Sequence, residues 1–287
     1  MTIPRMTVLV VGATGSIGRL VVDEALRQGH VVRALVRTPA KAGRLPPEAQ
    51  VFVADVTRPD TLSGVTDGVD AIVFTLGSDG AGKVGAESVD YGGVRNVLRA
   101  LGSRKARIAL MTAIGVTNRT GAYNRATEAH DWKRRSERLV RASGLPYTIV
   151  RPGWFDYNGP DEHQLFLLQG DKRQAGNSSD GVVARRQIAE VLVRSLGSNH
   201  ALRKTFELIA ATGPAPDDFD ALFAPVDADP QDALDGVHDM ANMPLEEEPQ
   251  RVRDDLDAVL ADRSTNGQSL QRGTSVLRRK SLTRRKL

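Results

Sequence analysis

The sequence predicts an α/β protein built around a doubly wound parallel sheet. Six short runs of apolar and β-branched residues recur within residues 1–212, and segments of helical periodicity lie between them. The runs are continuously apolar rather than alternating, which is typical of strands buried on both faces of a parallel sheet. Strand–helix–strand repetition at this spacing favours right-handed crossovers, with helices on both faces.

The expected elements follow in chain order. Strands are expected at 7–12, 31–37, 51–56, 71–77, 107–115 and 147–153. One helical pattern starts near Leu20 and stops at Gly29, a second runs 89–101 before Gly102, and a third runs 126–143 before Gly144. Glycine is favoured just past a helix end, because it adopts a left-handed backbone without a steric penalty. The later segment "DGVVARRQIAEVLVRSL" indicates a turn and an amphipathic helix that packs on the core.

Charge divides the chain into three parts. Residues 1–212 carry a net charge of +9, residues 213–262 carry −13 and residues 263–287 carry +8. The second part is rich in Pro, Asp and Ala, and the third is polar and basic, so we expect 213–287 to be mostly disordered or loosely attached. The chain then consists of one domain (1–212), an acidic linker (213–262) and a basic tail (263–287). The tail could contact nucleic acid or an anionic membrane, or fold back on the acidic linker.

Composition excludes several chemistries. The chain has no cysteine, so it contains no disulfide, thiol nucleophile or cysteine zinc site, and its five histidines show no metal-ligand spacing. It has no G-x-S-x-G motif and no P-loop. The first residues lack a signal-peptide pattern, and no run approaches the roughly 18 apolar residues of a spanning helix. These features favour a cytoplasmic location.

Three glycines stand at the first expected strand-to-helix turn. In "VLVVGATGSIGRLVVDEAL" (8–26), Gly12, Gly15 and Gly18 follow a buried strand and open an amphipathic helix. Glycines at such a turn permit a tight backbone, let phosphates approach the main chain and allow close helix–strand packing. The helix N-terminus then directs unpaired N–H groups at the phosphates. This is the dinucleotide-binding arrangement of the Rossmann fold; the alternative is a tight turn with no ligand.

The end of the second expected strand indicates which dinucleotide binds. An acidic residue that grips the adenosine ribose usually stands there, about 20 residues beyond the glycines. Here the place reads "LVRTPAKAGR", with Arg37 and no acid. A guanidinium pairs with a 2′-phosphate through two donors, so we expect NADP(H) in preference to NAD(H). The alternative is that Arg37 is solvated surface.

Together these residues resemble a known family. "GATGSIG", "LVR", "VADVT" and "SGLPYTIVRPG" are similar to motifs of the atypical short-chain dehydrogenase/reductases, closest to the NmrA-like, NAD(P)H-binding group, over residues 6–210. The resemblance implies that the pyrophosphate is wrapped by Gly12, Thr14, Gly15, Ser16, Ile17 and Gly18. It implies that Arg37 holds the 2′-phosphate, that Asp55 and Val56 lie against adenine, and that Leu76 and Gly77 border the adenosine ribose. It further places Thr112 and Ala113 near the nicotinamide ribose, and Pro152, Gly153 and Trp154 at the nicotinamide end.

The chain departs from the family at its catalytic set. Active members often use a Tyr-x-x-x-Lys motif together with a Ser after the fifth strand. The Tyr side chain exchanges a proton with the substrate oxygen. Here Lys133 is the matching lysine, but Ala129 occupies the tyrosine position and Thr112 is the nearest substitute for the serine. Lys133 could still bind the cofactor ribose, or could be a solvated lysine one turn from Glu137.

Five other side chains are weaker candidates. His130 lies near Lys133 in sequence and could donate a proton, although adjacent residues on a helix point about 100° apart; the alternative is a surface histidine. Tyr91 is expected to pack or to lie at a rim. Tyr123, Asn124 and His163 fall in segments that a substrate could pass.

Three functions remain open on the sequence. An NADPH-dependent reductase of a flavin, quinone or small carbonyl acceptor fits best, because flavins and quinones can take protons from water without a Tyr acid. The alternatives are an NADP(H)-responsive regulator that contacts a protein partner, and an assembly protein that uses only the fold. Residues 154–181 are expected to form much of the substrate wall; neither the acceptor nor the oligomeric state can be identified from the sequence.

Overall fold

The computed structural model describes residues 4–78 and 80–263. Within these residues, strands form one sheet in the order β3-β2-β1-β4-β5-β6-β10-β9-β7, and β8 also pairs with β10. The parallel strands are β1 (Thr7–Val11), β2 (Val31–Val36), β3 (Gln50–Val53), β4 (Ala71–Phe74), β5 (Arg107–Met111), β6 (Tyr147–Pro152) and β10 (Lys204–Ala211). The expected fold class and its six strands are therefore confirmed.

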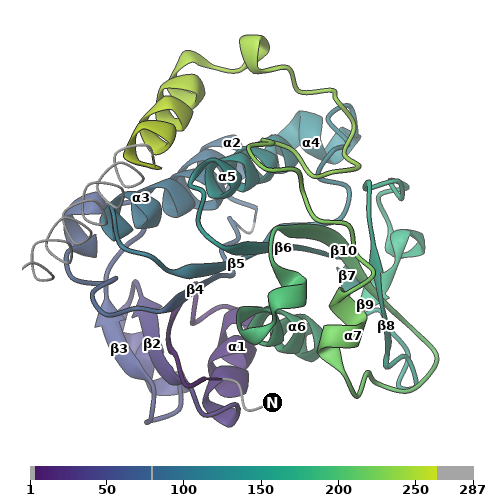
Figure 1. Cartoon of the computed structure of the whole chain (residues 1–287), viewed down its shortest axis with the longest axis horizontal. Coiled ribbons are helices and arrows are strands. Elements are labelled where there is room, and N and C mark those ends of the chain that lie inside the picture. The colour runs from purple at the N-terminus through teal and green to yellow at the C-terminus, as the bar shows by residue number, and fades with distance from the viewer. Residues whose placement is uncertain (1–3, 79, 264–287) are drawn as a thin grey trace, which may run out of the picture.

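Helices cover both faces of the sheet (Figure 1). One face carries α1 (Ser16–Arg27) and α6 (Arg185–Gly197); the other carries α3 (Gly92–Leu101) and α5 (Ala129–Ala142). Alternate residues of each strand serve the two layers: in β1, Val8 and Val10 pack towards α1, whereas Leu9 and Val11 pack towards α3. This double burial explains why the strands are apolar throughout.

The expected helices form, with one difference. A short α2 (Gly82–Gly85) and a π-helical turn (Ala86–Tyr91) precede α3, and the helices α1, α3 and α5 end within two residues of the predicted glycines. The helix expected over 126–143 is interrupted. Glu128 has a left-handed backbone (φ +55°), which separates α4 (Ala122–Thr127) from α5.

Strand β10 was not expected from the sequence. Its run "KTFELIAA" contains two charged residues that are buried, Lys204 and Glu207. Each has a partner: the Lys204 ammonium donates to the carbonyl of Phe223 (2.7 Å), and Glu207 accepts from Arg151 (3.2 Å). Antiparallel to β10 lie β8 (Gln164–Leu168) and β9 (Val182–Val183), and β7 (Trp154–Phe155) pairs with β9.

The acidic segment 213–262 packs against the domain, so the expected loosely attached linker is corrected. It includes α7 (Phe219–Phe223) and a helical stretch at 250–263 that lies over the α3–α5 side in yellow (Figure 1). Phe223, Met243 and Val252 are buried in the core. The physical reason is charge compensation: carboxylates of this segment pair with arginines of α5 and β6 instead of repelling one another.

The basic tail begins where the described residues end. Arg263 forms an ion pair with Asp232 (2.7 Å), so this first residue does fold back on the acidic segment. The remainder, 264–287, lies outside the described residues, and so do its expected contacts with nucleic acid or membrane. In the described part of the chain, no helix has the length and apolarity needed to cross a membrane.

Candidate cofactor site

The three glycines form a tight turn between β1 and α1. Gly12 has φ +94°, and a Cβ there would lie 2.8 Å from the Thr75 carbonyl oxygen. A Cβ on Gly18 would overlap the Gly12 carbonyl, so this helix position needs glycine for packing. Gly15 is the N-cap of α1, with an extended backbone and no side-chain cap. Ala13 and Ile17 are buried beneath the turn.

The outer side of this turn is open. Gly15 and Ser16 are exposed and Thr14 is partly exposed. The first N–H groups of a helix have no partner within the helix, and they carry partial positive charge. The Gly15 N–H donates to the Gly12 carbonyl (3.0 Å), so the free N–H groups of the helix begin at Ser16. Such groups beside a residue without a side chain fit a pyrophosphate, so the residues present fit a dinucleotide.

Arg37 follows β2, the strand beside β1. Val11 of β1 is in register with Leu35 of β2, so the glycine turn and Arg37 leave the sheet at the same edge. Arg37 is exposed. Within 4–78 and 80–263 its guanidinium makes no hydrogen bond or ion pair, in contrast to Arg33, which binds the carbonyls of Val65 and Asp67. A free guanidinium at this place is able to receive a phosphate.

The residues expected around adenine and around the adenosine ribose meet at the neighbouring strand ends. Val56 and Leu76 both contact the position of Gly93 on α3, where a Cβ would lie 2.7 Å from Leu76 Cδ1 and 3.1 Å from Val56 Cγ2. The Asn96 amide fixes this wall by donating to the Val56 carbonyl (2.8 Å). Gly77 next to Leu76 is exposed.

The Asp55 carboxylate forms hydrogen bonds within the turn that follows β3. Its carboxylate accepts from the Thr57 N–H (2.9 Å) and hydroxyl (2.8 Å). This geometry orders the segment after β3, and the contact with adenine stays a prediction.

Both residues expected to be catalytic are engaged within the protein. Thr112 is buried, and its hydroxyl donates to Glu137 Oε1 (2.7 Å), so its proton is directed into the core rather than towards a substrate. Lys133 donates to Asp90 Oδ1 (2.9 Å). Lys133 is therefore neither solvated nor paired with Glu137. Their catalytic roles stay predictions, which this geometry does not favour.

Asp90 connects Lys133 to the end of β4. Its second oxygen accepts from the Ser78 hydroxyl (2.8 Å), one residue beyond Gly77. The Lys133 ammonium is thereby held on the side of the sheet where the ribose was expected. Ala129, at the position of the family's tyrosine, is buried and supplies no proton.

The expected nicotinamide end divides into a buried and an exposed part. Pro152 and Gly153 are buried, and a Cβ on Gly153 would collide with the Gly181 carbonyl, so this glycine permits the packing of β7 against β9. Trp154 is 37% exposed and its ring meets that of Tyr157 edge-on, with centroids 6.2 Å apart. The exposed aromatic side chains begin the segment expected to form the substrate wall.

Two of the weaker candidates have structural roles. Tyr91 is buried, and its hydroxyl donates to Asp255 (2.9 Å). Asn124 is buried. Its side-chain carbonyl oxygen accepts from the N–H groups of His130 (3.0 Å) and Asp131 (3.1 Å), which caps the start of α5. The packing role expected for Tyr91 is confirmed.

The structure brings two of the other three candidates together. Burial lowers the pKa of His130, and its ring lies 5.1 Å from that of the exposed Tyr123. His163 is exposed beyond β7. Among the described residues, no side-chain hydroxyl is bonded to the Lys133 ammonium in place of the missing tyrosine.

A buried ionic network beneath the site was missed by sequence reasoning. Arg151 of β6 bonds to Glu137 (2.7 Å), Asp239 (2.7 Å) and Glu207 (3.2 Å), all of them buried or nearly so. Burial raises the pKa of Glu207 to about 7. For Asp239 burial acts in the same direction, but the Arg151 guanidinium outweighs it and holds the pKa well below its usual range.

A second group of arginines lies on α5. Arg134 and Arg138 share Asp235, Arg135 pairs with Glu248 (2.6 Å), and Arg141 pairs with Asp229 (3.1 Å). The signal in the sequence was the run "KRRSERLVR", which places arginines on the helix face that must pack. Buried cations require anionic partners, and the carboxylates of the acidic segment 213–262 are those partners.

Comparisons agree with this geometry. Residues 12–199 match the model of a family described as NAD(P)H-binding. Sanguinarine reductase from Eschscholzia californica is 26% identical over 77% of this chain and 96% of that protein. Photosystem II assembly factor Ycf39 from Synechocystis is 27% identical over 72% of this chain and 63% of that protein. A structure from Bacillus halodurans, named as a candidate NAD-dependent epimerase/dehydratase, has a TM-score of 0.63 at 24% identity over 77% of this chain and 97% of that one, which supports the fold.

Proposed function

Because the chain belongs to the NAD(P)H-binding family and to the atypical, NmrA-like short-chain dehydrogenase/reductases, we propose that it is an NADPH-dependent reductase whose acceptor takes its proton from water. The observation that carries this proposal is the open glycine turn beside the free guanidinium of Arg37. An arginine there favours a 2′-phosphate over a 2′-hydroxyl, because guanidinium and phosphate form two parallel hydrogen bonds. The preference for NADP(H) over NAD(H) is part of the proposal.

The residues of this chain would bind and orient the reactants. The N–H groups of the first turn of α1, from Ser16 onwards, would hold the pyrophosphate, and Arg37 would hold the 2′-phosphate. Val56 would lie against the adenine and Leu76 against its ribose. Bound NADPH would supply a hydride. The acceptor gains that hydride and one proton from solvent, and a flavin or quinone suits this reaction because its reduced form is protonated without a buried acid.

The missing acid argues for this class of acceptor. Ala129 replaces the tyrosine, and the hydroxyl of Thr112 and the ammonium of Lys133 are bonded to carboxylates at 2.7 Å and 2.9 Å. A simple carbonyl needs a positioned proton donor, because alkoxide development is costly without one. The relative named sanguinarine reductase also supports a reductase. The absence of cysteine supports a reducing, cytoplasm-like compartment.

A second function is favoured by the same engaged groups. With both expected catalytic side chains bonded inside the protein, the chain could bind NADP(H) and report its redox state to a protein partner. One relative is named an assembly factor, which supports this alternative. A regulator requires different affinities for NADPH and NADP⁺, since a ligand with equal affinity for two states shifts nothing.

Steady-state turnover separates the two functions. NADPH oxidation is followed with menadione or free flavin as acceptor, and the same reaction without protein is the control. The reductase predicts turnover well above that control. If NADPH binds but neither acceptor is reduced, the reductase is excluded, and a pull-down with and without NADP(H) tests the regulator.

A further inference from the structure

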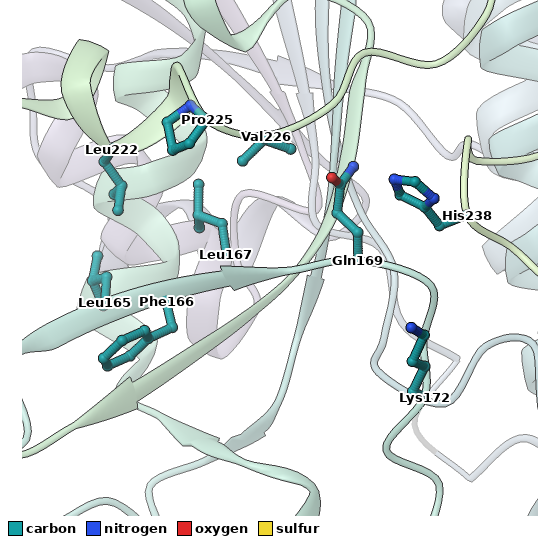
Figure 2. Close-up of a pocket in the computed structure, with 9 residues that line it drawn as sticks. All are labelled: Leu165, Phe166, Leu167, Gln169, Lys172, Leu222, Pro225, Val226 and His238. Atoms are coloured by element: carbon teal, nitrogen blue, oxygen red, sulfur yellow. The ribbon is translucent and has the colours of Figure 1, made fainter.

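A second cavity lies away from the glycine turn, between β8 and the segment around α7 (Figure 2). Its volume is about 490 Å³, within the range of roughly 300–1,000 Å³ that is usual for small-molecule sites. Leu165 and Leu167 of β8 face Leu222, Pro225 and Val226 across it. One end of the cavity is therefore apolar on both sides.

The opposite end is polar. Gln169, Lys172 and His238 gather there, just beyond the end of β8 (Figure 2). The turn that carries Gln169 and Lys172 packs closely against His238: Gly170 has φ +90°, and a Cβ on it would lie 3.1 Å from the His238 carbonyl oxygen. The cavity thus has an apolar end and a polar end.

Hydrogen bonds fix its walls. The Gln169 amide donates to the Asp227 carbonyl (3.0 Å) and accepts from the Asp227 N–H (3.0 Å), which joins the end of β8 to the segment after α7. Buried Lys204 donates to the Phe223 carbonyl (2.7 Å) and holds the end of α7. A site that is already ordered binds a ligand with a smaller entropic cost.

One cation at the polar end is not engaged by an anion. Asp227 is already paired with His238 (2.8 Å). Lys172 is exposed, and its ammonium has no hydrogen bond or ion pair within the described ranges. The Lys172 ammonium is therefore the group at this end that is available to an anionic ligand.

A smaller cavity of about 220 Å³ adjoins this end and shares Gln169 and Lys172 with it. It adds Arg173 and Glu207 to the lining, and Glu207 accepts from Arg151 (3.2 Å) and from the Asp171 N–H (3.1 Å). Its carboxylate is thus occupied by other donors, and Lys172 remains the group that can meet a ligand from either cavity.

We propose that this cavity binds an apolar monoanion, a carboxylic acid with a medium-length alkyl or compact aromatic body. The body would lie between β8 and the α7 segment, and the carboxylate would pair with Lys172. Burial of the apolar body provides affinity and the single cation provides selectivity for an acid. The site uses none of the residues of the glycine turn, but Leu165, Leu167, Gln169 and Lys172 belong to the segment 154–181 that is expected to form the substrate wall.

Calorimetry on the full chain tests this proposal with octanoate and 4-phenylbutyrate, and with octan-1-ol as the uncharged comparison. We expect one acid to bind with a stoichiometry of one, and the alcohol to bind at least about tenfold more weakly. Lys172→Gln should weaken the acid at least about tenfold. The exposed Lys41 lies outside the cavity, and Lys41→Gln should leave acid binding unchanged.

A second variant tests the apolar half. Leu222 is partly exposed, so Leu222→Trp should fold, as checked by its thermal unfolding, and the larger ring should block the cavity and abolish acid binding. Saturable binding that is lost in both variants supports the proposal. It is overturned if neither acid binds, if the alcohol binds equally well, or if binding survives Leu222→Trp.

Discussion

Arg151 and Asp239, 88 residues apart in the sequence, form two parallel hydrogen bonds of 2.7 Å each. The guanidinium belongs to the central strand β6, and the carboxylate belongs to the acidic segment. Both side chains are buried to 2% exposure or less. This pair ties the acidic segment to the sheet directly beneath the expected nicotinamide end.

Asp239→Asn should destabilise the protein by about 3 kcal/mol, because breaking one partner of a buried pair leaves a poorly compensated charge. Glu137 still faces Arg151 in the variant, which limits the loss. Urea unfolding measures the free energy. Asp217 is an exposed acid of the same segment, and Asp217→Asn should change stability by less than about 0.5 kcal/mol. Equal stability of the two variants would refute a structural role for the pair.

Such pairs mark the limit of what the sequence predicts. The parallel sheet, its first six strands and the glycine turn follow from local apolar runs and from turn chemistry, so they could be read directly. Strand β10 was not predicted because its run contains the charged residues Lys204 and Glu207. Their burial depends on partners from other elements. The acidic segment resembled a linker because its net charge is compensated only in three dimensions.

The same holds within the site. The glycines and Arg37 lie where the pattern placed them, since each follows a strand end at one edge of the sheet. The engagement of Thr112 by Glu137 and of Lys133 by Asp90 could not be predicted, because each partner comes from a separate helical segment. Local sequence gives positions along an element, and tertiary packing decides which polar groups remain free.

Ionisation of Glu207 should lower the free energy of unfolding as the pH rises from about 4.5 to 7. Its folded pKa is raised to about 7 from the ordinary 4.5, so the folded state holds a proton that the unfolded state has lost. The stabilisation is complete below the unfolded pKa and is lost as the pH rises through the folded pKa. Urea unfolding across this range should show a decline of roughly 1–3 kcal/mol for the native chain.

Glu207→Gln should flatten that decline, because the amide does not titrate. Glu48 is exposed, and Glu48→Gln should leave the pH profile unchanged. A Glu207→Gln protein that keeps the full decline would show that another group causes it.

Gly18→Ala should damage both folding and cofactor binding. The added methyl overlaps the Gly12 carbonyl, so the turn must shift, at a cost of about 1–3 kcal/mol in stability. The displaced N–H groups should weaken NADPH binding at least about tenfold, as measured by calorimetry. At Gly43 a Cβ meets no atom within 4 Å, so Gly43→Ala is the matched control and should retain normal binding. Unchanged affinity in Gly18→Ala would argue against phosphate binding at this turn.

Lys133→Met should weaken NADPH binding about tenfold. The expected reason is that the ammonium, which is paired with Asp90, also binds the cofactor ribose. Lys83 is also paired with a carboxylate, that of Glu128, and Lys83→Met provides the comparison. Thermal unfolding of both variants separates a loss of affinity from a loss of fold. Normal NADPH affinity in a folded Lys133→Met protein would leave Lys133 with only its structural pairing to Asp90.

Calorimetric titration with NADPH and NADH at one salt concentration tests the central claim most directly. The account predicts that NADPH binds at least about tenfold more tightly than NADH, and that Arg37→Ala removes this difference without weakening NADH. Arg58 is exposed and lies beyond β3, so Arg58→Ala should preserve the preference. Equal affinities for the two nucleotides, or a preference that survives Arg37→Ala, would contradict the assignment of NADPH. If neither nucleotide binds, the glycine turn is only a turn, and the proposed reductase is wrong.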